Sequence, residues 1–262
     1  MLNKPMIGVA AAVVVVAAGT WYFLHTRSPQ PRVPVEATPS QPEPAAEPAI
    51  AHPLPAGDTA SQAPLPALAD SDGPLREALT PLVGASTLTE YLRPDSIIRH
   101  VVVTIDNLPR QKVAVDKRPL NPVPGTFAAR GDELHATLDT QNFARYQPLV
   151  AVIRKLDMQQ VGAVYIRFYP LFQQSYQDLG YPNGYFNDRL VKVIDVLLAT
   201  PQPTGPIELI RPNVMYTFAD PTLEALPAGQ KLLIRMGPDN AAAIKSKLME
   251  LRAVITAAPL KH

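Results

Sequence analysis

The stretch MQQVGAVYIRFYPLFQQSYQDL, residues 158–179, is the most hydrophobic helix candidate outside the first 24 residues of the chain. Its large apolar side chains recur every three or four residues, which is the spacing of one face of an α-helix. These side chains are Val161, Val164, Tyr165, Phe168 and Phe172. Gly180 follows, and glycine commonly ends a helix because it adopts the left-handed conformation without strain. We therefore predict a core helix over residues 158–179.

Helical patterns continue on both sides of this segment. Pro74 and the Arg93-Pro94-Asp95 run each predict a helix start, because proline is favoured at the first helical position. After the second start, apolar residues fall on one face at positions 97, 98, 101, 102, 105 and 108. Their β-branched character would also suit a strand, but they do not alternate, so a helix is preferred. Further helices are expected from residue 139 or 140 to about 157, over 189–199 with Asn187 as the N-cap, and over 238–255.

Short β elements are expected among these helices. Gly131-Asp132 lies between two extended pieces within residues 127–138, which is typical of a hairpin. Three more strand-like pieces cover residues 207–210, 214–218 and 231–236. The fold class predicted is mainly α, an α+β domain with a small hairpin and a few short strands, over residues 74–262.

The N-terminus carries an apolar run, residues 6–24, that contains no charged residue and ends in Trp21-Tyr22-Phe23. About 20 apolar residues cross a bilayer as a helix, and aromatic rings settle at the membrane interface. The run therefore predicts a transmembrane helix that binds the lipid bilayer. The alternative is a cleaved signal peptide with Val16-Ala17-Ala18 as the cleavage site. The thin positive start and the bulky rings after that site favour a retained anchor.

The orientation of this anchor rests on a near-tied charge balance. Lys4 favours a cytoplasmic N-terminus, but Arg27 and Arg32 flank the other side. The chain has no cysteine, which avoids wrong disulfides in an oxidising compartment. We therefore expect a single-pass protein of the bacterial inner membrane, with residues 1–24 as cytoplasmic stub and membrane helix and the C-terminal domain in the periplasm. A cytoplasmic domain is the alternative.

Residues 25–73 form a segment rich in proline and alanine. Proline fixes φ and removes a backbone donor, so neither helix nor sheet propagates there. We predict a disordered linker with polyproline-II character. It serves either as a spacer that holds the domain away from the membrane or as a solubilising tether.

Composition excludes several kinds of chemistry. Without cysteine, the chain has no thiolate nucleophile and no Cys-ligated metal. No histidine pair is spaced like that of a zinc helix, and no GxSxG, GxGxxG or GxxxxGK motif occurs. Residues 74–262 hold 21 basic and 17 acidic residues without a basic cluster, so no nucleic-acid partner is expected. We predict no metal and no cofactor.

The densest unusual stretch, residues 181–189, combines a Pro-Asn-Gly turn, two tyrosines and charged residues before a helix. Such a loop suits binding of a sugar or a peptide. Alternatively, its rings fill the core and Asn187 or Asp188 caps the helix. The candidate binding residues here are Tyr181, Asn183, Tyr185, Asn187, Asp188 and Arg189.

Asp220 and Glu224 are two carboxylates at helical spacing, the best local candidates for paired acid–base chemistry. Asp220 precedes Pro221, however, and is equally a natural N-cap. No catalytic residue is assigned. A second polar group on the helix after Asp95 comprises Arg99, His100, Asp106, Asn107 and Arg110, and a solvated helix face explains it as well.

Several runs together resemble one family of bacterial envelope proteins with an N-terminal membrane helix, the domain-of-unknown-function family numbered 3014. The runs begin at Tyr91, Thr104, Tyr169, Gly180, Phe218 and Gly229, and the resemblance covers most of residues 75–254. It implies no activity and therefore no catalytic residues. It agrees with an order of anchor, linker and domain.

These observations favour an uncharacterised membrane-anchored protein whose periplasmic domain binds another envelope component, a protein or the cell wall. The first alternative is an enzyme that acts on cell-wall material through Asp220, Glu224 or the loop 181–189. The second is a passive scaffold that oligomerises through its anchor. The sequence leans away from an enzyme because no catalytic constellation is recognisable.

Overall fold

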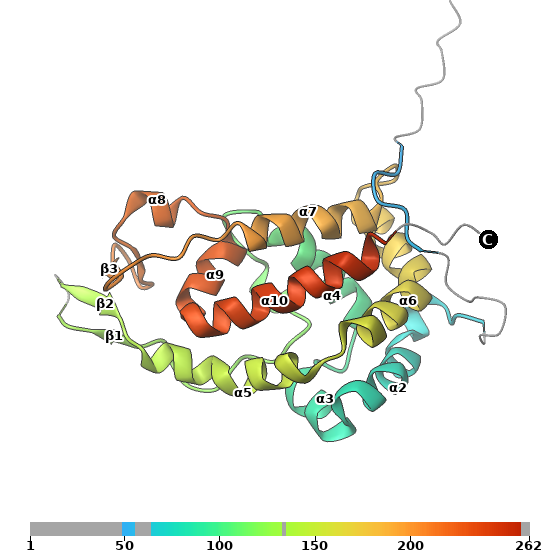
Figure 1. The fold of residues 1–262 in the computed structure, drawn as a ribbon, viewed down its shortest axis with the longest axis horizontal. Coiled ribbons are helices and arrows are strands. Elements are labelled where there is room, and N and C mark those ends of the chain that lie inside the picture. The colour runs from blue at the N-terminus through green and yellow to red at the C-terminus, as the bar shows by residue number, and fades with distance from the viewer. Residues whose placement is uncertain (1–48, 56–63, 133–134, 258–262) are drawn as a thin grey trace, which may run out of the picture. The chain divides into compact units, whose positions relative to one another are not determined.

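Helix α10 (Pro238–Ile255) runs through the middle of the helical domain, and other helices pack along it (Figure 1). The computed structural model describes residues 49–55, 64–132 and 135–257. Helix α10 contacts α5 (Gln141–Lys155), α6 (Met158–Asp178), α7 (Phe186–Leu198) and α9 (Ala228–Met236). Further helices are α2 (Asp72–Val83), α3 (Ala85–Tyr91), α4 (Ile97–Asn107), the single turn α8 (Pro221–Glu224) and two 3-10 turns, η2 (Leu68–Asp70) and η3 (Val115–Lys117).

Helix α4 packs against both α6 and α7 and contributes to the largest hydrophobic cluster of the core. Ile98 and Val102 are four residues apart, lie on one face of α4 and are fully buried. They share a hydrophobic cluster with Phe168 of α6 and Phe186 of α7. The helix predicted after Asp95, rather than a strand, is therefore confirmed.

Helix α6 confirms the prediction for residues 158–179. Gly180 follows its end with a φ of +113°, in the left-handed region that favours glycine. Within α6, a Cβ at Gly162 would clash with the side chain of Val254 in α10. Glycine at this position therefore allows α6 and α10 to approach closely.

The strands of the described region form a single antiparallel sheet. They are, in spatial order, β1 (Ala129–Arg130), β2 (Ala136–Leu138), β3 (Glu208–Ile210) and β4 (Thr217–Phe218). The predicted hairpin is confirmed, since Ala129 pairs with Leu138. Leu209 of β3 pairs with Phe218 of β4, and both are buried against Ile234 of α9. The fold is thus mainly helical, with a small sheet at one end of the helices (Figure 1).

The strand expected over residues 231–236 is wrong, because these residues belong to helix α9. Leu233 and Ile234 are neighbours and both are buried, whereas a strand would point them to opposite faces. Gly229 and Leu233, four residues apart, lie on the same buried face of the helix. A short apolar run does not distinguish a strand from a buried helix by periodicity alone.

Part of the expected linker contacts the helical domain. Leu68 and Ser71 are buried, and Leu65 packs against the core cluster of α2, α4 and α6. Leu54 packs against side chains of α7 and α10. The prediction of disorder also covers residues 25–48 and 56–63, which lie outside the described residues.

The apolar run at residues 6–24 also lies outside the described residues, and so does the predicted transmembrane helix. No helix of the described region combines the length and the hydrophobicity that a membrane span requires.

Candidate functional site

Residues 181–189, which we call the loop 181–189, comprise the end of the connection between α6 and α7 and the first turn of α7, and they contact the end of α4. The Tyr181 hydroxyl accepts a hydrogen bond from Arg110 Nη2 at 3.0 Å and lies 3.4 Å from Asp106 Oδ2. Arg189 Nη2 donates to the Asp106 carbonyl at 2.7 Å and lies 3.0 Å from Asp106 Oδ1. Two residues of the loop and two of the α4 region therefore form one polar cluster.

Asp106 is the centre of this cluster and is 2% exposed. Its carboxylate pairs with Arg110, just beyond the end of α4, and with Arg189 on α7. The negative charge of Asp106 raises the pKa of the Arg110 guanidinium, which stays charged. Of the two interpretations of the polar group on this helix, the solvated face is wrong for Asp106, because Asp106 follows Val102 by four residues and shares its buried face.

The rings of the loop stack against the aromatic side chains of α6. Tyr181 stacks on Tyr176 with ring centroids 4.5 Å apart, and Phe186 stacks on Phe172 at 5.7 Å. The ring centroid of Tyr165 lies 5.4 Å from that of Phe172, so Tyr165 belongs to the same aromatic cluster. The rings of Tyr181 and Phe186 therefore contribute to packing, as the alternative interpretation of the loop expects.

Asn187 holds three segments together instead of capping a helix. It lies in the first turn of α7, where Tyr185 occupies the N-cap position without a side-chain cap. Asn187 Oδ1 accepts from the Tyr165 hydroxyl at 3.1 Å, and Nδ2 donates to the carbonyls of His52 and Ile255 at 2.8 and 3.1 Å. The predicted cap is wrong because this 1% exposed amide is turned toward the core.

Asp188 binds the segment at residues 49–55, which we call the docked segment. Its two carboxylate oxygens accept from the backbone N–H groups of Ala51 at 3.0 Å and His52 at 2.6 Å. Asp188 also lies in the first turn of α7, where a negative charge is favourable. Asn183, by contrast, is exposed at the tip of the loop.

Asp220 and Glu224 do not act as a pair, because each carboxylate has other partners. Asp220 Oδ1 accepts from the Thr222 N–H and hydroxyl, both at 2.7 Å, which confirms the alternative role as N-cap. Glu224 Oε2 accepts from the Phe218 N–H at 3.0 Å, and Oε1 lies 2.7 Å from Lys231 Nζ.

Both carboxyl groups are held in the ionised form. The Thr222 hydroxyl and N–H lower the pKa of Asp220. Burial acts to raise the pKa of Glu224, but the Lys231 ammonium and the Phe218 N–H outweigh it, so this pKa is also lowered. A general acid near neutral pH needs a raised carboxyl pKa, and neither group has one.

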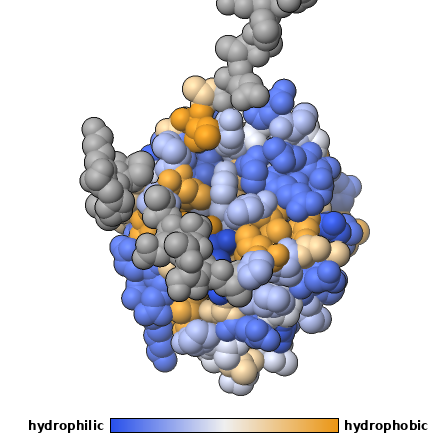
Figure 2. Space-filling model, turned by 90° about the vertical axis from the view of Figure 1, so that its right-hand side faces the viewer, coloured by the Kyte–Doolittle hydropathy of each residue, from blue (hydrophilic) through white to orange (hydrophobic). Residues whose placement is uncertain are grey.

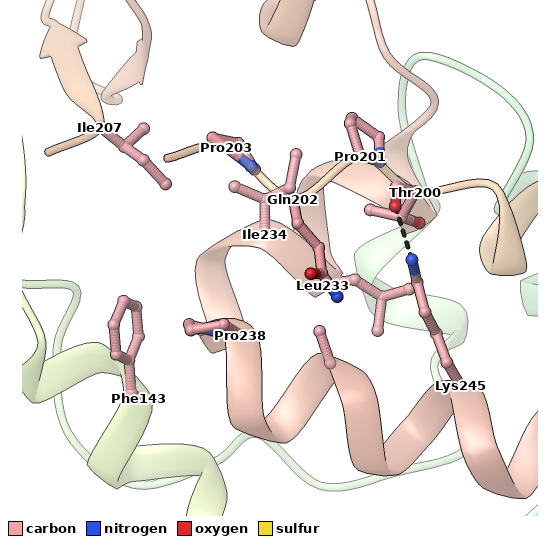
Figure 3. Close-up of a pocket in the computed structure, with 12 residues that line it drawn as sticks. Phe143, Thr200, Pro201, Gln202, Pro203, Ile207, Leu233, Ile234, Pro238 and Lys245 are labelled. Carbon is pink, nitrogen blue, oxygen red and sulfur yellow. Dashed lines mark hydrogen bonds between the residues drawn. The ribbon is translucent and has the colours of Figure 1, made fainter. Parts of the chain in front are cut away.

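A small pocket lies between the start of α10 and the segment after α7 (Figure 3). Its volume is about 50 Å³, and Phe143, Ile207 and Leu233 contribute to its lining. Lys245 is bound to the Thr200 carbonyl at 2.5 Å at its edge. The pocket has room for a few water molecules rather than for an organic ligand. Among the described residues, no group of three or more His, Asp or Glu side chains is arranged to hold a metal ion.

Sequence reasoning identified the loop but missed its partner on α4. The signal was present, since Asp106 continues the four-residue spacing of the buried Ile98 and Val102. A carboxylate on a buried helix face requires a cationic partner, and Arg189 is a basic residue in the unusual stretch. No local pattern pointed to the contact between Asp188 and the docked segment.

Comparison with known proteins agrees with the resemblance of the sequence motifs. No curated protein and no solved structure matches this chain. A family model described as "Protein of unknown function (DUF3014)" matches residues 97–252. The match covers more than half of the chain, from the start of α4 into the last turn of α10. The chain therefore belongs to the DUF3014 family of proteins of unknown function.

Proposed function

We propose that this chain is a membrane-anchored protein of the bacterial envelope whose helical domain binds another envelope component. One observation carries the preference for binding over catalysis. The candidate carboxylates of Asp188, Asp220 and Glu224 already accept hydrogen bonds from backbone N–H groups of the same chain. A group used in this way stabilises the fold and has little freedom to exchange protons with a substrate. The apolar run at residues 6–24 and the proline-rich segment support the tethered arrangement.

The surface of the loop 181–189 is the region where we place the contact with that component. Asn183 is exposed at its tip, and Arg110 beside Tyr181 has 54% of its side chain exposed. Arg110 pairs with the buried Asp106, and the ring of Tyr181 stacks on an aromatic side chain of α6. A polar surface on a rigid base limits the loss of conformational freedom on binding.

Photo-crosslinking in native membranes tests this proposal. A photoreactive amino acid replaces Asn183 in the full-length protein, and the matched control replaces Val214, which is 77% exposed in the connection between β3 and β4. We expect one reproducible adduct from position 183 that position 214 does not form. The absence of a specific adduct at position 183 contradicts the proposal.

The rival function is an enzyme that acts on cell-wall material. Turnover of muropeptides by the full-length protein, lost in Asp220→Ala while the fold is kept, would establish the rival. Asp220 is exposed and caps only the single turn α8, so this variant is expected to fold.

A further inference from the structure

A second, larger cavity lies among α2, α4, α6, α7 and α10. Its volume is about 240 Å³. Side chains from all five helices line it, including Leu75, Ile97, Val164, Phe186 and Leu251. The cavity thus lies in the main core, beside the aromatic cluster formed by α6 and the loop.

The lining is apolar throughout. Ten of its thirteen side chains are Leu, Ile or Val, and two are phenylalanine. The thirteenth, Tyr165, directs its hydroxyl to Asn187 Oδ1 at 3.1 Å. Burial raises the pKa of this hydroxyl, in keeping with its apolar surroundings. The lining therefore offers no unpaired polar group to an occupant.

The apolar lining gives ordered water no hydrogen-bond partner. A buried water needs two to four polar partners, and an engineered apolar cavity of about 150 Å³ stays dry and binds benzene. Protein interiors hold few voids larger than a water molecule, because the cost of a void grows with its volume. The present pocket is also apolar, but it is larger and partly open to solvent, so it has room for a larger hydrocarbon guest.

We propose that this cavity binds a single alkyl chain, the acyl chain of a lipid or a free fatty acid. The inference gives a ligand class to the binding domain proposed above and so rests on that proposal. A flexible alkyl chain follows the space between packed helices, and its methylene groups require no hydrogen bonds. Its polar end has to remain in solvent, because the lining has nothing to pair with it.

The surface around the domain is compatible with this arrangement. Figure 2 shows hydrophobic side chains that reach the surface between polar ones on the side that it displays. Seven of the lining residues, among them Leu79, Val101, Val161 and Val164, are only half-buried. An alkyl chain that covers them removes further apolar area from water.

The docked segment lies against the same part of the core. Leu54 packs on a cluster that includes Leu190 and Leu251, and both of these line the cavity. Asn187 connects the cavity wall to this segment, since it binds both Tyr165 and the His52 carbonyl. Occupancy of the cavity is therefore expected to strengthen docking of residues 49–55.

The test uses a palmitic acid analogue that carries a diazirine on its alkyl chain, added to native membranes that contain the full-length protein. After illumination, crosslinked peptides are mapped by mass spectrometry. We expect crosslinks in the lining peptides of α4 and α6 that unlabelled palmitic acid removes by competition. A phosphatidylethanolamine with the same diazirine chain distinguishes a lipid from a free fatty acid as the source.

Two variants fill the cavity, and one control does not. Val164→Phe and Val101→Phe place a ring in the cavity from different helices, whereas Ala163→Phe adds the same ring at the exposed neighbouring position of α6. Loss of the crosslinks in both filling variants, with retention in the control, is the expected result. Two filling variants guard against a single one that fails to fold, and thermal unfolding of each variant reports its fold.

Crosslinks that are unchanged in both filling variants, or confined to residues 6–24, overturn the inference. If that happens while the adduct at position 183 persists, the domain binds an envelope component but not an alkyl chain. If the adduct is absent as well, the proposed function fails with it.

Discussion

At the scale of single residues, the fold depends on a buried carboxylate between two arginines. Asp106 has 3% of its side chain exposed, whereas Arg189 has 20% and Arg110 has 54%. A charge removed from water is tolerated only when it is paired. The link from Asp106 to Arg189 joins α4 to α7 and fixes the loop between α6 and α7.

Removing this carboxylate should destabilise the protein strongly. We expect Asp106→Ala to lower the free energy of unfolding by about 3 kcal/mol, because it leaves Arg189 partly buried without its partner. Urea denaturation of the purified protein measures the change. The control, Asp178→Ala at the exposed end of α6, should change stability by no more than about 0.5 kcal/mol. Similar losses in both variants would mean that the buried pair has no special role.

At the scale of secondary structure, close helix packing depends on glycine at one point. Gly162 of α6 faces Val254 of α10, and a Cβ there has no space. Gly73 of α2 has nothing within 4 Å of the corresponding position. Both glycines lie in helices, so a change to alanine raises the helix propensity at each position. Only at Gly162 does the added methyl group also meet a neighbouring side chain.

We expect opposite signs for alanine at these two positions. Gly162→Ala should destabilise by about 1–3 kcal/mol because it forces α6 and α10 apart. Gly73→Ala should stabilise by about 0.4–1 kcal/mol because it restricts the unfolded chain. Midpoints of thermal unfolding give both signs, and a stabilising Gly162→Ala would contradict the close approach of these helices.

The docked segment provides a second prediction at this scale. Asp188→Asn removes the charge and one of the two acceptors that Ala51 and His52 use, so their amides should exchange with deuterium faster. Hydrogen exchange measured by mass spectrometry on the peptide that covers residues 49–55 reports this effect. Asp178→Asn is the charge-matched control. Equal protection in Asp188→Asn and the unaltered protein would mean that Asp188 does not hold the segment.

The elements differ in how far the sequence predicts them. In α4, α6 and α10, apolar side chains recur at helical spacing over several turns. The existence and approximate bounds of these helices therefore follow from the spacing alone. The sequence predicts a strand where α9 lies, because the apolar run from Leu232 to Ile234 is too short to show a period. Docking of residues 49–55 depends on Asp188 more than 130 positions later, and no local pattern encodes such a contact.

At the scale of the whole molecule, stability should depend on pH through carboxylates with lowered pKa values. The Arg252 guanidinium lowers the pKa of Asp195, and the Thr222 hydroxyl lowers that of Asp220. The unfolded chain then binds more protons than the folded one, so stability is lost as pH falls. Both groups are substantially exposed, and each contribution is therefore small.

We expect the midpoint of thermal unfolding to stay nearly constant from about pH 7 to 5 and to fall below about pH 4, where carboxylates with ordinary pKa values begin to protonate. The fall should continue through the lowered pKa values of the folded state. Asp220→Asn should make it shallower. A midpoint that does not fall on acidification contradicts the assigned hydrogen bonds.

The site was less predictable than the fold, for a physical reason. The unusual composition of residues 181–189 marked the loop, but composition does not say which side chains face inward. The sequence predicts that Asn187 caps a helix, for example, but in the structure this residue is 1% exposed and faces the core. The sequence does not reveal the apolar cavity, because its lining residues have the types and the spacing of ordinary core residues.

We propose that the chain is tethered to a membrane with its helical domain in the envelope, and the compartment of that domain is the first property to measure. Alkaline phosphatase, which is active only outside the cytoplasm, is fused after His262, and a fluorescent protein that folds only in the cytoplasm is fused there in a second strain. We predict an active phosphatase and a dark fluorescent fusion. A bright fluorescent fusion with inactive phosphatase would contradict this proposal and place the domain in the cytoplasm.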